Sequence, residues 1–304
     1  MELRHIRYFL AVAGEGNFTR AAARLGIGQP PLSLQIKDLE AEIGARLFHR
    51  LPHGAELTEA GQAFRDAVRS IPDHAAGAIL AAQRAARGET GRLTLGVTGT
   101  AALNPIVSSV IRAFRRAYPA AELTLEESNS VALVANLLAG RLDVAILRPT
   151  NSDPAELQKH ALIEETLVVA MPSTHPAAHR RGKLNLAMMK GAPLILTPRS
   201  AGTSLHDAAV NACRSAGFEP TLGQPAPQIA TILSLVSAEL GISLVPASMR
   251  SFHINGVVFR DLNPAPPRVA LAVAHRGERP PPLIQNFTMI ARDISRLHRA
   301  SGAV

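Results

Sequence analysis

The chain has 304 residues, yet it contains one cysteine and no tryptophan, and aromatic side chains make up only 4% of it. Cys213 has no partner for an internal disulfide and no companion cysteine for a structural zinc site, so we expect it to serve ordinary packing. A run of about eighteen apolar residues, as a membrane span requires, is missing, and Met1–His5 leads into an amphipathic stretch without a signal-type apolar block. These absences predict a cytoplasmic protein that is not inserted in a membrane.

Motifs of common enzyme classes are missing as well. The sequence has no G-x-S-x-G elbow for a serine nucleophile and no His-Glu-x-x-His pair for a catalytic metal. The stretch GVTGTA is too short for a phosphate-binding P-loop and lacks the following Gly-Lys-Ser/Thr. We therefore expect no enzyme activity, no catalytic residue, no cofactor and no metal site.

Positive charge is present, but it is not concentrated at one end. The formal net charge is +8, and residues 1–58 hold seven Lys/Arg against six Asp/Glu, a net of +1. Residues 59–88 also have a net charge of +1, which leaves +6 for the rest. The net charge suggests an anionic partner but does not by itself indicate nucleic-acid binding.

The N-terminal region shows helical periodicity. Apolar residues recur at helical spacing from Leu3 to Ala13, and Asn17 is a plausible N-cap for a short alanine-rich helix over 18–25. Gly26–Gly28 then forms a turn. These features predict two helices followed by a tight connection.

A third helix is expected to open with Pro30 and Pro31 in its first turn, where their missing N–H groups would have no intrahelical partner. Residues 45–58 read as two short strands around a turn at 52–54. Residues 1–58 are therefore predicted to be a winged helix-turn-helix. The buried stripe of the third helix should consist of Leu32, Ile36, Leu39 and Ile43.

A linker helix is expected over residues 59–88, capped by Thr58 and kinked at Pro72. Its apolar residues form one stripe from Phe64 to Ala82. An exposed apolar stripe of this length needs a partner.

Strands and helices alternate from Arg92 onward, which predicts an α/β fold with parallel strands. Two α/β lobes in tandem, with a last strand and helix left over, suggest that the chain returns to the first lobe. We expect an effector domain over 89–304, with lobe I at about 89–163 and 268–304 and lobe II at about 164–267. The hinge should lie near 163–166 and 264–268. The expected strands are 92–97, 122–126, 142–147, 166–171, 193–197, 242–246 and 269–275. The expected helices lie at about 103–118, 131–139, 204–216, 228–239 and 282–299.

The whole chain resembles the LysR-type transcriptional regulators. The resemblance rests on FLAVAGEGNFTRAAARLGIGQPPLSLQIKDLEAEIGARLFHR, GAELTEAG, GRLTLGV, LLAGRLDVAILR and GISLVPAS, in this order and spacing. Within the family, QPPLS and GISLVPAS are most similar to regulators of benzoate, catechol and chlorocatechol degradation. The resemblance implies a winged helix-turn-helix, a linker helix and a two-lobed effector domain like that of periplasmic binding proteins. It also implies a homodimer to homotetramer that binds promoter DNA and a small-molecule effector, with activation of transcription and RNA polymerase as a protein partner.

A recognition helix places its N-terminal residues near base edges, while phosphate contacts fix its register. Gln29 can bond adenine, Ser33 can reach a base or a phosphate, and Lys37 offers a phosphate contact. The alternative for each is an ordinary solvated surface residue. The candidate DNA-binding residues are Thr19, Arg20, Gln29, Pro30, Pro31, Ser33, Leu34, Lys37, Arg50 and His53.

The recognition stretch departs from the family at two positions, because Gly28 and Leu34 stand where most relatives carry Ser and Arg. Leu34 follows Leu32 by two residues, a rotation of roughly 200° on a helix, and should point away from the core. We expect it to contact a thymine methyl group; the alternative is a neutral exposed leucine.

Ligands of α/β sheets bind beyond the carboxyl ends of the strands, near helix N-termini. The hydroxyls of Thr98, Thr100, Ser130, Thr203 and Ser204 follow such strand ends and should converge on one cleft that suits a carboxylate. Alternatively, they only cap the helices that follow.

Resemblance to the muconate-responsive members places the effector against Thr100 and Ser130 on one lobe. It places Thr203, Leu205 and Gln228 on the other lobe, with Leu205 where the family has an aromatic side chain. Arg148 is a candidate electrostatic partner at the lobe junction, or else a solvated or ion-paired arginine. The effector is expected to be an aromatic or dicarboxylic acid.

Two other functions share part of this organisation. A solute-binding protein without DNA function would have the two lobes but would not need residues 1–88. An architectural DNA-binding protein would have the N-terminal module but would not need the lobes.

Overall fold

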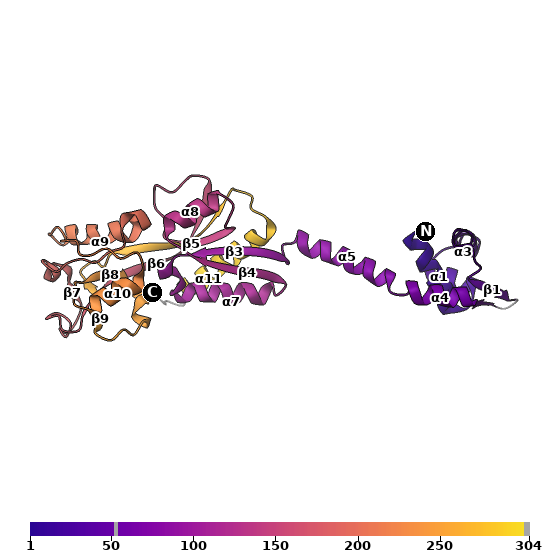
Figure 1. Cartoon of the computed structure of the whole chain (residues 1–304), viewed down its shortest axis with the longest axis horizontal. Helices are drawn as coiled ribbons and strands as arrows, with labels where there is room; N and C mark the ends of the chain where they lie inside the picture. The colour runs from indigo at the N-terminus through magenta and orange to yellow at the C-terminus, as the bar shows by residue number, and fades with distance from the viewer. Residues whose placement is uncertain (52–53, 301–304) are drawn as a thin grey trace. The chain divides into compact units, whose positions relative to one another are not determined.

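The computed structural model describes residues 1–51 and 54–300, and the chain divides after Arg84 into two compact units. The N-terminal unit contains three helices, a two-stranded hairpin and then two more helices, α4 and α5, and it lies at the indigo end of Figure 1. Its elements are α1 (Leu3–Glu15), α2 (Phe18–Leu25), α3 (Gln29–Ile43), β1 (Phe48–Leu51), β2 (Gly54–Leu57), α4 (Glu59–Val68) and α5 (Ile71–Ala86), of which the last runs into the second unit. This is a winged helix-turn-helix followed by linker helices.

The expected cap and turn residues set the two ends of α2 and the start of α3. Asn17 caps α2 by accepting hydrogen bonds from the backbone N–H groups of Thr19 and Arg20, at 2.8 and 3.1 Å. Gly26 ends α2 with φ 66°, in the left-handed region that favours glycine. Gln29 is the first residue of α3, and the two prolines follow it in the first turn, where no intrahelical bond is lost.

An aromatic cluster holds the N-terminal unit together. The ring of Phe9 on α1 lies 4.9 Å from that of Phe64 on α4 and 5.3 Å from that of Phe48 on β1, measured between centroids. Leu32, Ile36 and Leu39 of α3 are buried as predicted. Ile43 was wrongly predicted to be buried, since it is 39% exposed at the helix end, where Gly44 terminates α3.

The linker is broken rather than kinked. Thr58 caps α4 through the backbone N–H of Gly61, at 2.9 Å, but α4 ends at Val68 and α5 starts at Ile71. Pro72 has no N–H to donate to the carbonyl of residue 68, and its ring would clash with that carbonyl, so the interruption falls before the proline.

The predicted apolar stripe therefore has two parts. Phe64 and Val68 pack into the N-terminal core, together with Ile71. Across α5, which the structure describes in full, no residue is buried, and Ile79 is 61% exposed. The unpartnered part of the stripe lies on α5.

The second unit is built on one seven-stranded sheet with the order β4-β3-β5-β11-β6-β8, in which β9 also pairs with β6. Strands β3, β4 and β5 are parallel, and β11 runs antiparallel to β5 and β6. The strands are β3 (Gly91–Val97), β4 (Ala121–Glu127), β5 (Val144–Leu147), β6 (Leu157–Pro172), β8 (Ser243–Pro246), β9 (Val257–Arg260) and β11 (Arg268–Arg276), and a separate small sheet pairs β7 (Leu184–Asn185) with β10 (Leu262–Asn263).

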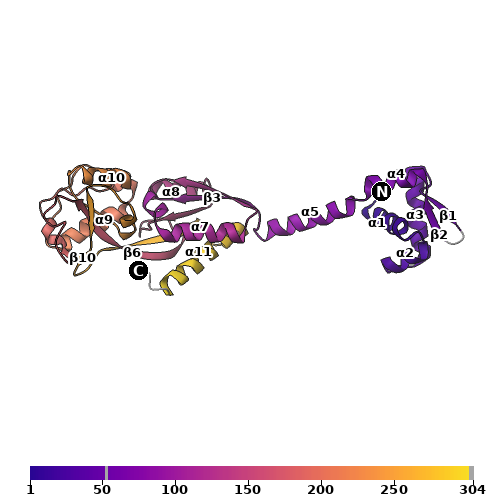
Figure 2. The same ribbon diagram turned by 90° about the horizontal axis from the view of Figure 1, so that it is seen from below.

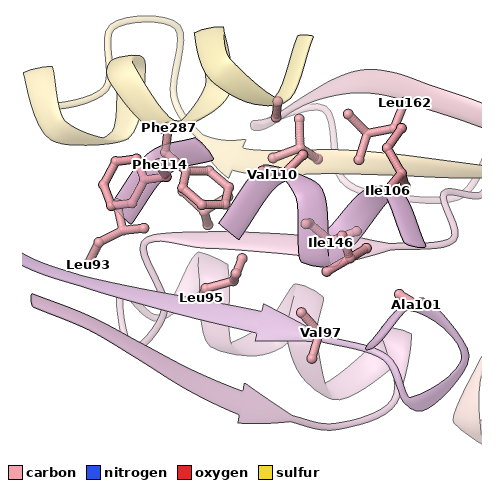
Figure 3. Close-up of a cluster of buried hydrophobic side chains, with 14 of the residues drawn as sticks. Leu93, Leu95, Val97, Ala101, Ile106, Val110, Phe114, Ile146, Leu162 and Phe287 are labelled. Carbon is pink, nitrogen blue, oxygen red and sulfur yellow. The ribbon is translucent and has the colours of Figure 1, made fainter. Parts of the chain in front are cut away.

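Lobe I has helices on both faces of its sheet. In Figure 2, α8 (Ser130–Leu138) lies on one side, with α7 (Pro105–Ala117) and α11 (Pro282–Ala300) on the other. Figure 3 shows the second of these layers, where Phe114 and Phe287 meet with ring centroids 5.2 Å apart above Leu93 and Leu95. On the α8 side, Gly96 leaves room for neighbouring leucines, because a Cβ there would lie 2.6 Å from the side chain of Leu133.

Lobe II repeats this layering around the second half of β6. Leu167, Val169 and Met171 belong to the cluster that includes α9 (Thr203–Ser215), and Val168 and Ala170 to the one that includes α10 (Ile229–Ser237). Alternate residues of one apolar run thus face opposite helices, as expected of a strand buried on both sides. Short 3₁₀ helices complete the lobe: η1 (Leu186–Met189), η2 (Arg199–Ala201) and η3 (Ala247–Ser251).

The junction between the lobes lies inside a continuous strand. β6 pairs with β11 as far as Thr166, and from Leu167 it pairs with β8. The segment predicted to be the hinge, 163–166, is therefore regular strand. The register of β11 shifts between Leu271 and Ala272, which marks an irregularity close to this junction.

One predicted element in the second unit is wrong. Residues 193–197 are not a strand but form isolated parallel bridges from Leu194 to Leu222 and to Ile242, the residue before β8. The helix expected over about 103–118 is α7, which starts at Pro105 after a separate short helix, α6 (Gly99–Ala102). Asn104 provides the cap of α7 by accepting a hydrogen bond from the N–H of Ile106.

Candidate nucleic-acid interface and effector cleft

The start of α3 presents an exposed polar and proline-rich face. Gln29, Pro30, Pro31 and Lys37 are exposed, and Ser33 is half-buried. The side chain of Gln29 has no hydrogen-bond partner within residues 1–51 and 54–300. The amide of Gln29 is therefore accessible for a base edge.

Leu34 lies on the same exposed face of α3. It is 57% exposed, although Leu32 and Ile36 on either side of it are fully buried. The rotation expected from helix geometry is thus observed, and the exposed face of α3 carries an apolar side chain beside Ser33 and Lys37.

The wing and the recognition helix are joined by one arginine. Arg50 on β1 donates from Nη1 to the hydroxyl of Ser33 at 3.1 Å, and its guanidinium lies 5.2 Å from the centroid of the Phe18 ring. Two residues that the sequence suggested separately are in contact, and Arg50 is held over an aromatic face. His53, also a candidate, lies outside the described residues.

At the start of α2, the charged candidate Arg20 is already bonded within the protein. Thr19 and Arg20 are exposed, but the guanidinium of Arg20 donates to the backbone carbonyl of Glu15, and Arg24 also pairs with the Glu15 carboxylate at 3.2 Å. A phosphate at this position would meet a charge that is already partly neutralised.

A cleft of about 700 Å³ opens between the two lobes of the second unit. This size lies within the usual range for small-molecule sites, ~300–1,000 Å³. The predicted effector residues Thr98, Thr100, Ser130, Arg148, Ser204, Leu205 and Gln228 all line it, and Thr203 does not. The structure brings together side chains from strand ends and helix starts in both lobes.

Arg148 is buried and partly engaged. It is 2% exposed, donates from Nε to Thr100 Oγ1 at 3.2 Å and forms an ion pair from Nη2 to Glu165 Oε2 at 2.9 Å. Its Nη1 has no hydrogen-bond partner in the described part of the chain. Burial lowers the pKa of Arg148, and the neighbouring Glu165 carboxylate partly offsets this. The Nη1 amino group of a lining guanidinium, with its two N–H donors, therefore remains to be satisfied.

The ion pair also connects the two lobes. Glu165 lies on β6 close to the junction, and its second oxygen, Oε1, accepts a hydrogen bond from the backbone N–H of Ser248 in η3, at 2.8 Å. Arg148 follows β5 of lobe I, whereas η3 belongs to lobe II. A chain of hydrogen bonds thus runs from Thr100 through Arg148 and Glu165 to Ser248.

The alternative reading of the small hydroxyls, as helix caps, holds for only one of them in the described structure. Thr98 caps α6 by accepting from the N–H of Ala101, at 3.3 Å. Ser130 is the first residue of α8, and the cap is the preceding Asn129, which accepts from the N–H of Ala132. Ser204 and Thr203 lie at the start of α9, where Gly202 is the cap without a side chain.

Sequence reasoning missed other residues of the cleft. Glu127 at the end of β4 and Phe252 at the end of η3 both line it, and Glu165 was not recognised as the partner of Arg148. Glu127 follows a strand directly, so its position at a carboxyl end was a usable signal. Phe252 and Glu165 gave no such signal, because one lies in a loop and the other inside a strand.

Sequence profiles of two families match the chain. The profile for the bacterial regulatory helix-turn-helix protein of the lysR family covers residues 3–62, and the LysR substrate binding domain covers residues 86–295. The chain belongs to the LysR family. It is a DNA-binding transcriptional regulator with an effector-binding domain, and not an enzyme.

Relatives of this LysR regulator resemble it over most of its length. The uncharacterized HTH-type transcriptional regulator YnfL of Escherichia coli strain K12 is 39% identical, over 84% of this chain and 85% of its own. The regulator AlsR of Bacillus subtilis strain 168 is 34% identical, over 96% of this chain and 95% of its own. The structure of full-length CbnR complexed with its target DNA covers 97% of this chain and 100% of its own, with a TM-score of 0.82 and 29% identity.

Within 1–51 and 54–300, none of the helices combines the length and the apolar character needed to cross a bilayer.

Proposed function

We propose that this LysR regulator binds a small organic acid, aromatic or dicarboxylic, in the cleft between its lobes. The bound acid changes the affinity of the protein for its operator DNA. The observation that carries the proposal is the buried guanidinium of Arg148, which lines the cleft with an unsatisfied Nη1. A carboxylate is the natural acceptor for such a donor, and charge-assisted hydrogen bonds are roughly twice as strong as neutral ones. The hydroxyls of Thr100 and Ser130 line the same space.

Coupling to the rest of the protein would pass through the Arg148–Glu165 pair. A carboxylate that bonds Arg148 competes with Glu165 for the same guanidinium, and Glu165 in turn holds Ser248 of lobe II. A ligand that binds one arrangement of the lobes more tightly shifts the population towards it, typically by about 1–3 kcal/mol. The effector therefore acts on the junction and not only on the cleft walls.

On the DNA side, Gln29 and Leu34 would read base edges, while Lys37 and Arg50 position the protein on the backbone. The exposed amide of Gln29 suits adenine, and Arg50 is already oriented by Ser33 and Phe18. Substituting Ala for Gln29 should weaken operator binding by about 1–3 kcal/mol. The structure of CbnR with its target DNA supports this assignment of the N-terminal unit to operator binding.

Assembly would use the linker. Residues 59–88 are proposed to pair with a second copy, since Ile79 and Leu80 of α5 are exposed at 61% and 44% in one chain. A homodimer or homotetramer would then present two or more recognition helices to one promoter, with RNA polymerase as the further partner and activation as the outcome.

The test is a thermal-shift screen of the full-length protein with aromatic acids and ring-cleavage dicarboxylates, followed by operator binding with each acid that shifts the melting temperature. We expect at least one acid to raise the melting temperature and to change the operator affinity. Ser130→Ala should reduce the thermal shift, whereas Ser109→Ala on α7, outside the cleft, should not. Failure of every acid to stabilise the protein would contradict the proposed effector class.

A further inference from the structure

We infer that the cleft accepts a compact monocarboxylate with an apolar or aromatic body in preference to a dicarboxylate. In this assignment Arg148 binds the single carboxylate, Phe252 contacts the apolar body, and Glu127 repels a second anionic group. The inference rests on the proposed function, namely that the cleft is the effector site, and it narrows the class of acid.

The first step concerns the number of anions that the cleft can neutralise. Arg148 is the single Lys, Arg or His side chain among the lining residues in the described part of the chain. Two of its three nitrogens are already used, by Thr100 and Glu165, and Nη1 alone is free. A second carboxylate in the cleft would lose its hydration without gaining a cationic partner, which makes its burial costly.

The second step concerns a negative charge that is already present. Glu127 lines the cleft, is exposed, and has no ion-pair partner among residues 1–51 and 54–300. Its Oε1 lies close to the start of α6, because a Cβ added to Gly99 would be 2.9 Å from it. Glu127 therefore stands on lobe I beside the Thr98–Thr100 segment, where a second carboxylate of a longer ligand would meet a like charge.

The third step concerns the apolar part of the cleft. Phe252 is the one aromatic side chain lining it in the described structure, and it is 37% exposed, so its ring is accessible to a ligand. Leu103 and Leu233 line the same cleft. An apolar body that stacks on the Phe252 ring would gain both buried area and aromatic contact.

The polar and apolar regions are joined by one short element. The backbone N–H of Phe252 donates to the carbonyl of Met249 at 2.9 Å and ends η3, and Ser248 in η3 bonds to Glu165 at 2.8 Å. The aromatic ring and the partner of Arg148 are thus fixed by the same 3₁₀ helix. A ligand with one carboxylate and one apolar body can address both regions at once.

The test is calorimetric titration of the full-length protein with benzoate, cyclohexanecarboxylate, adipate and cis,cis-muconate. We expect the two monocarboxylates to bind more tightly than the two dicarboxylates. Phe252→Ala should weaken benzoate by about tenfold, whereas Phe218→Ala, the same change at a half-buried site outside the cleft, should leave it unchanged.

Glu127→Gln separates charge from shape. This variant should raise the affinity for the dicarboxylates relative to the affinity for benzoate by about tenfold or more, because it removes the like charge. Glu126→Gln on the same strand, which does not line the cleft, is the matched control and should change neither.

The outcomes distinguish this inference from the proposed function. Tighter binding of the dicarboxylates to the unaltered protein, or an unchanged preference in Glu127→Gln, would overturn the monocarboxylate assignment and leave an organic-acid effector standing. Binding of none of the four acids to any variant would count against both.

Discussion

The proposed DNA-binding face of α3 and the proposed effector cleft place their polar groups in opposite environments. On α3, Gln29 and Leu34 project from the surface, and the buried residues beneath them belong to a separate stripe. In the cleft, Arg148 is 2% exposed and its partner Glu165 is 7% exposed, so the polar groups are part of the interior. A change on α3 can alter what is recognised and leave the fold intact, whereas a change at the Arg148–Glu165 pair alters recognition and stability together.

The largest effect is predicted for the substitution Glu165→Gln, which tests whether the buried pair matters for stability. It leaves the Arg148 guanidinium buried without a counter-charge, and losing one partner of a buried pair costs about 3–5 kcal/mol. We expect the free energy of unfolding to fall by about that amount, measured by urea unfolding followed by circular dichroism. The matched control is Glu122→Gln, whose pair with Arg92 is 62% and 68% exposed. That variant should lose less than about 1 kcal/mol, and equal losses in the two variants would refute the distinction.

A second prediction concerns Leu34→Arg, which should change recognition without changing stability. An arginine at this exposed position can form two hydrogen bonds with guanine, whereas the contact proposed for the leucine is with a thymine methyl group. Selection of binding sites from random DNA should therefore shift towards guanine at one position per half-site. Unchanged base preferences would show that Leu34 does not meet a base.

The smallest predicted effect is the salt dependence of operator binding. Residues 1–58 have a net charge of only +1, and Arg20 is partly neutralised by Glu15. The slope of log affinity against log salt concentration follows the number of phosphates neutralised and should be modest for a DNA-binding protein. Titrations of the operator at several salt concentrations give this slope, and a value near about −10 would contradict the prediction.

Local signals predicted the N-terminal unit well. Asn17, Gly26 and Thr58 are caps or turn residues whose chemistry acts within a few residues, and each occupies its expected position. The spacing of Leu32, Ile36 and Leu39 defined the buried side of α3 and therefore the exposure of Leu34. The position of the linker break was less predictable, since Pro72 acts on the carbonyl four residues earlier.

Long-range contacts could not be predicted from the sequence. Arg148 was recognised as a candidate, but its partner Glu165 lies seventeen positions away on another strand, and nothing in the local pattern connects them. Residues 193–197 are apolar enough for a strand, yet Leu194 forms only isolated bridges, to Leu222 and to Ile242 beside β8. Phe252 reaches the cleft because of the course of η3, which depends on the packing of lobe II.

The continuity of β6 through the junction has a mechanical consequence. Since β6 and β11 keep their backbone hydrogen bonds up to Thr166, the lobes have no loop at this strand about which to swing freely. Rotating one lobe against the other must instead twist the paired strands, and paired strands tolerate a range of twist without losing their ladder. An effector that shifts the lobes, as proposed, would therefore have to work against the twist of this strand pair.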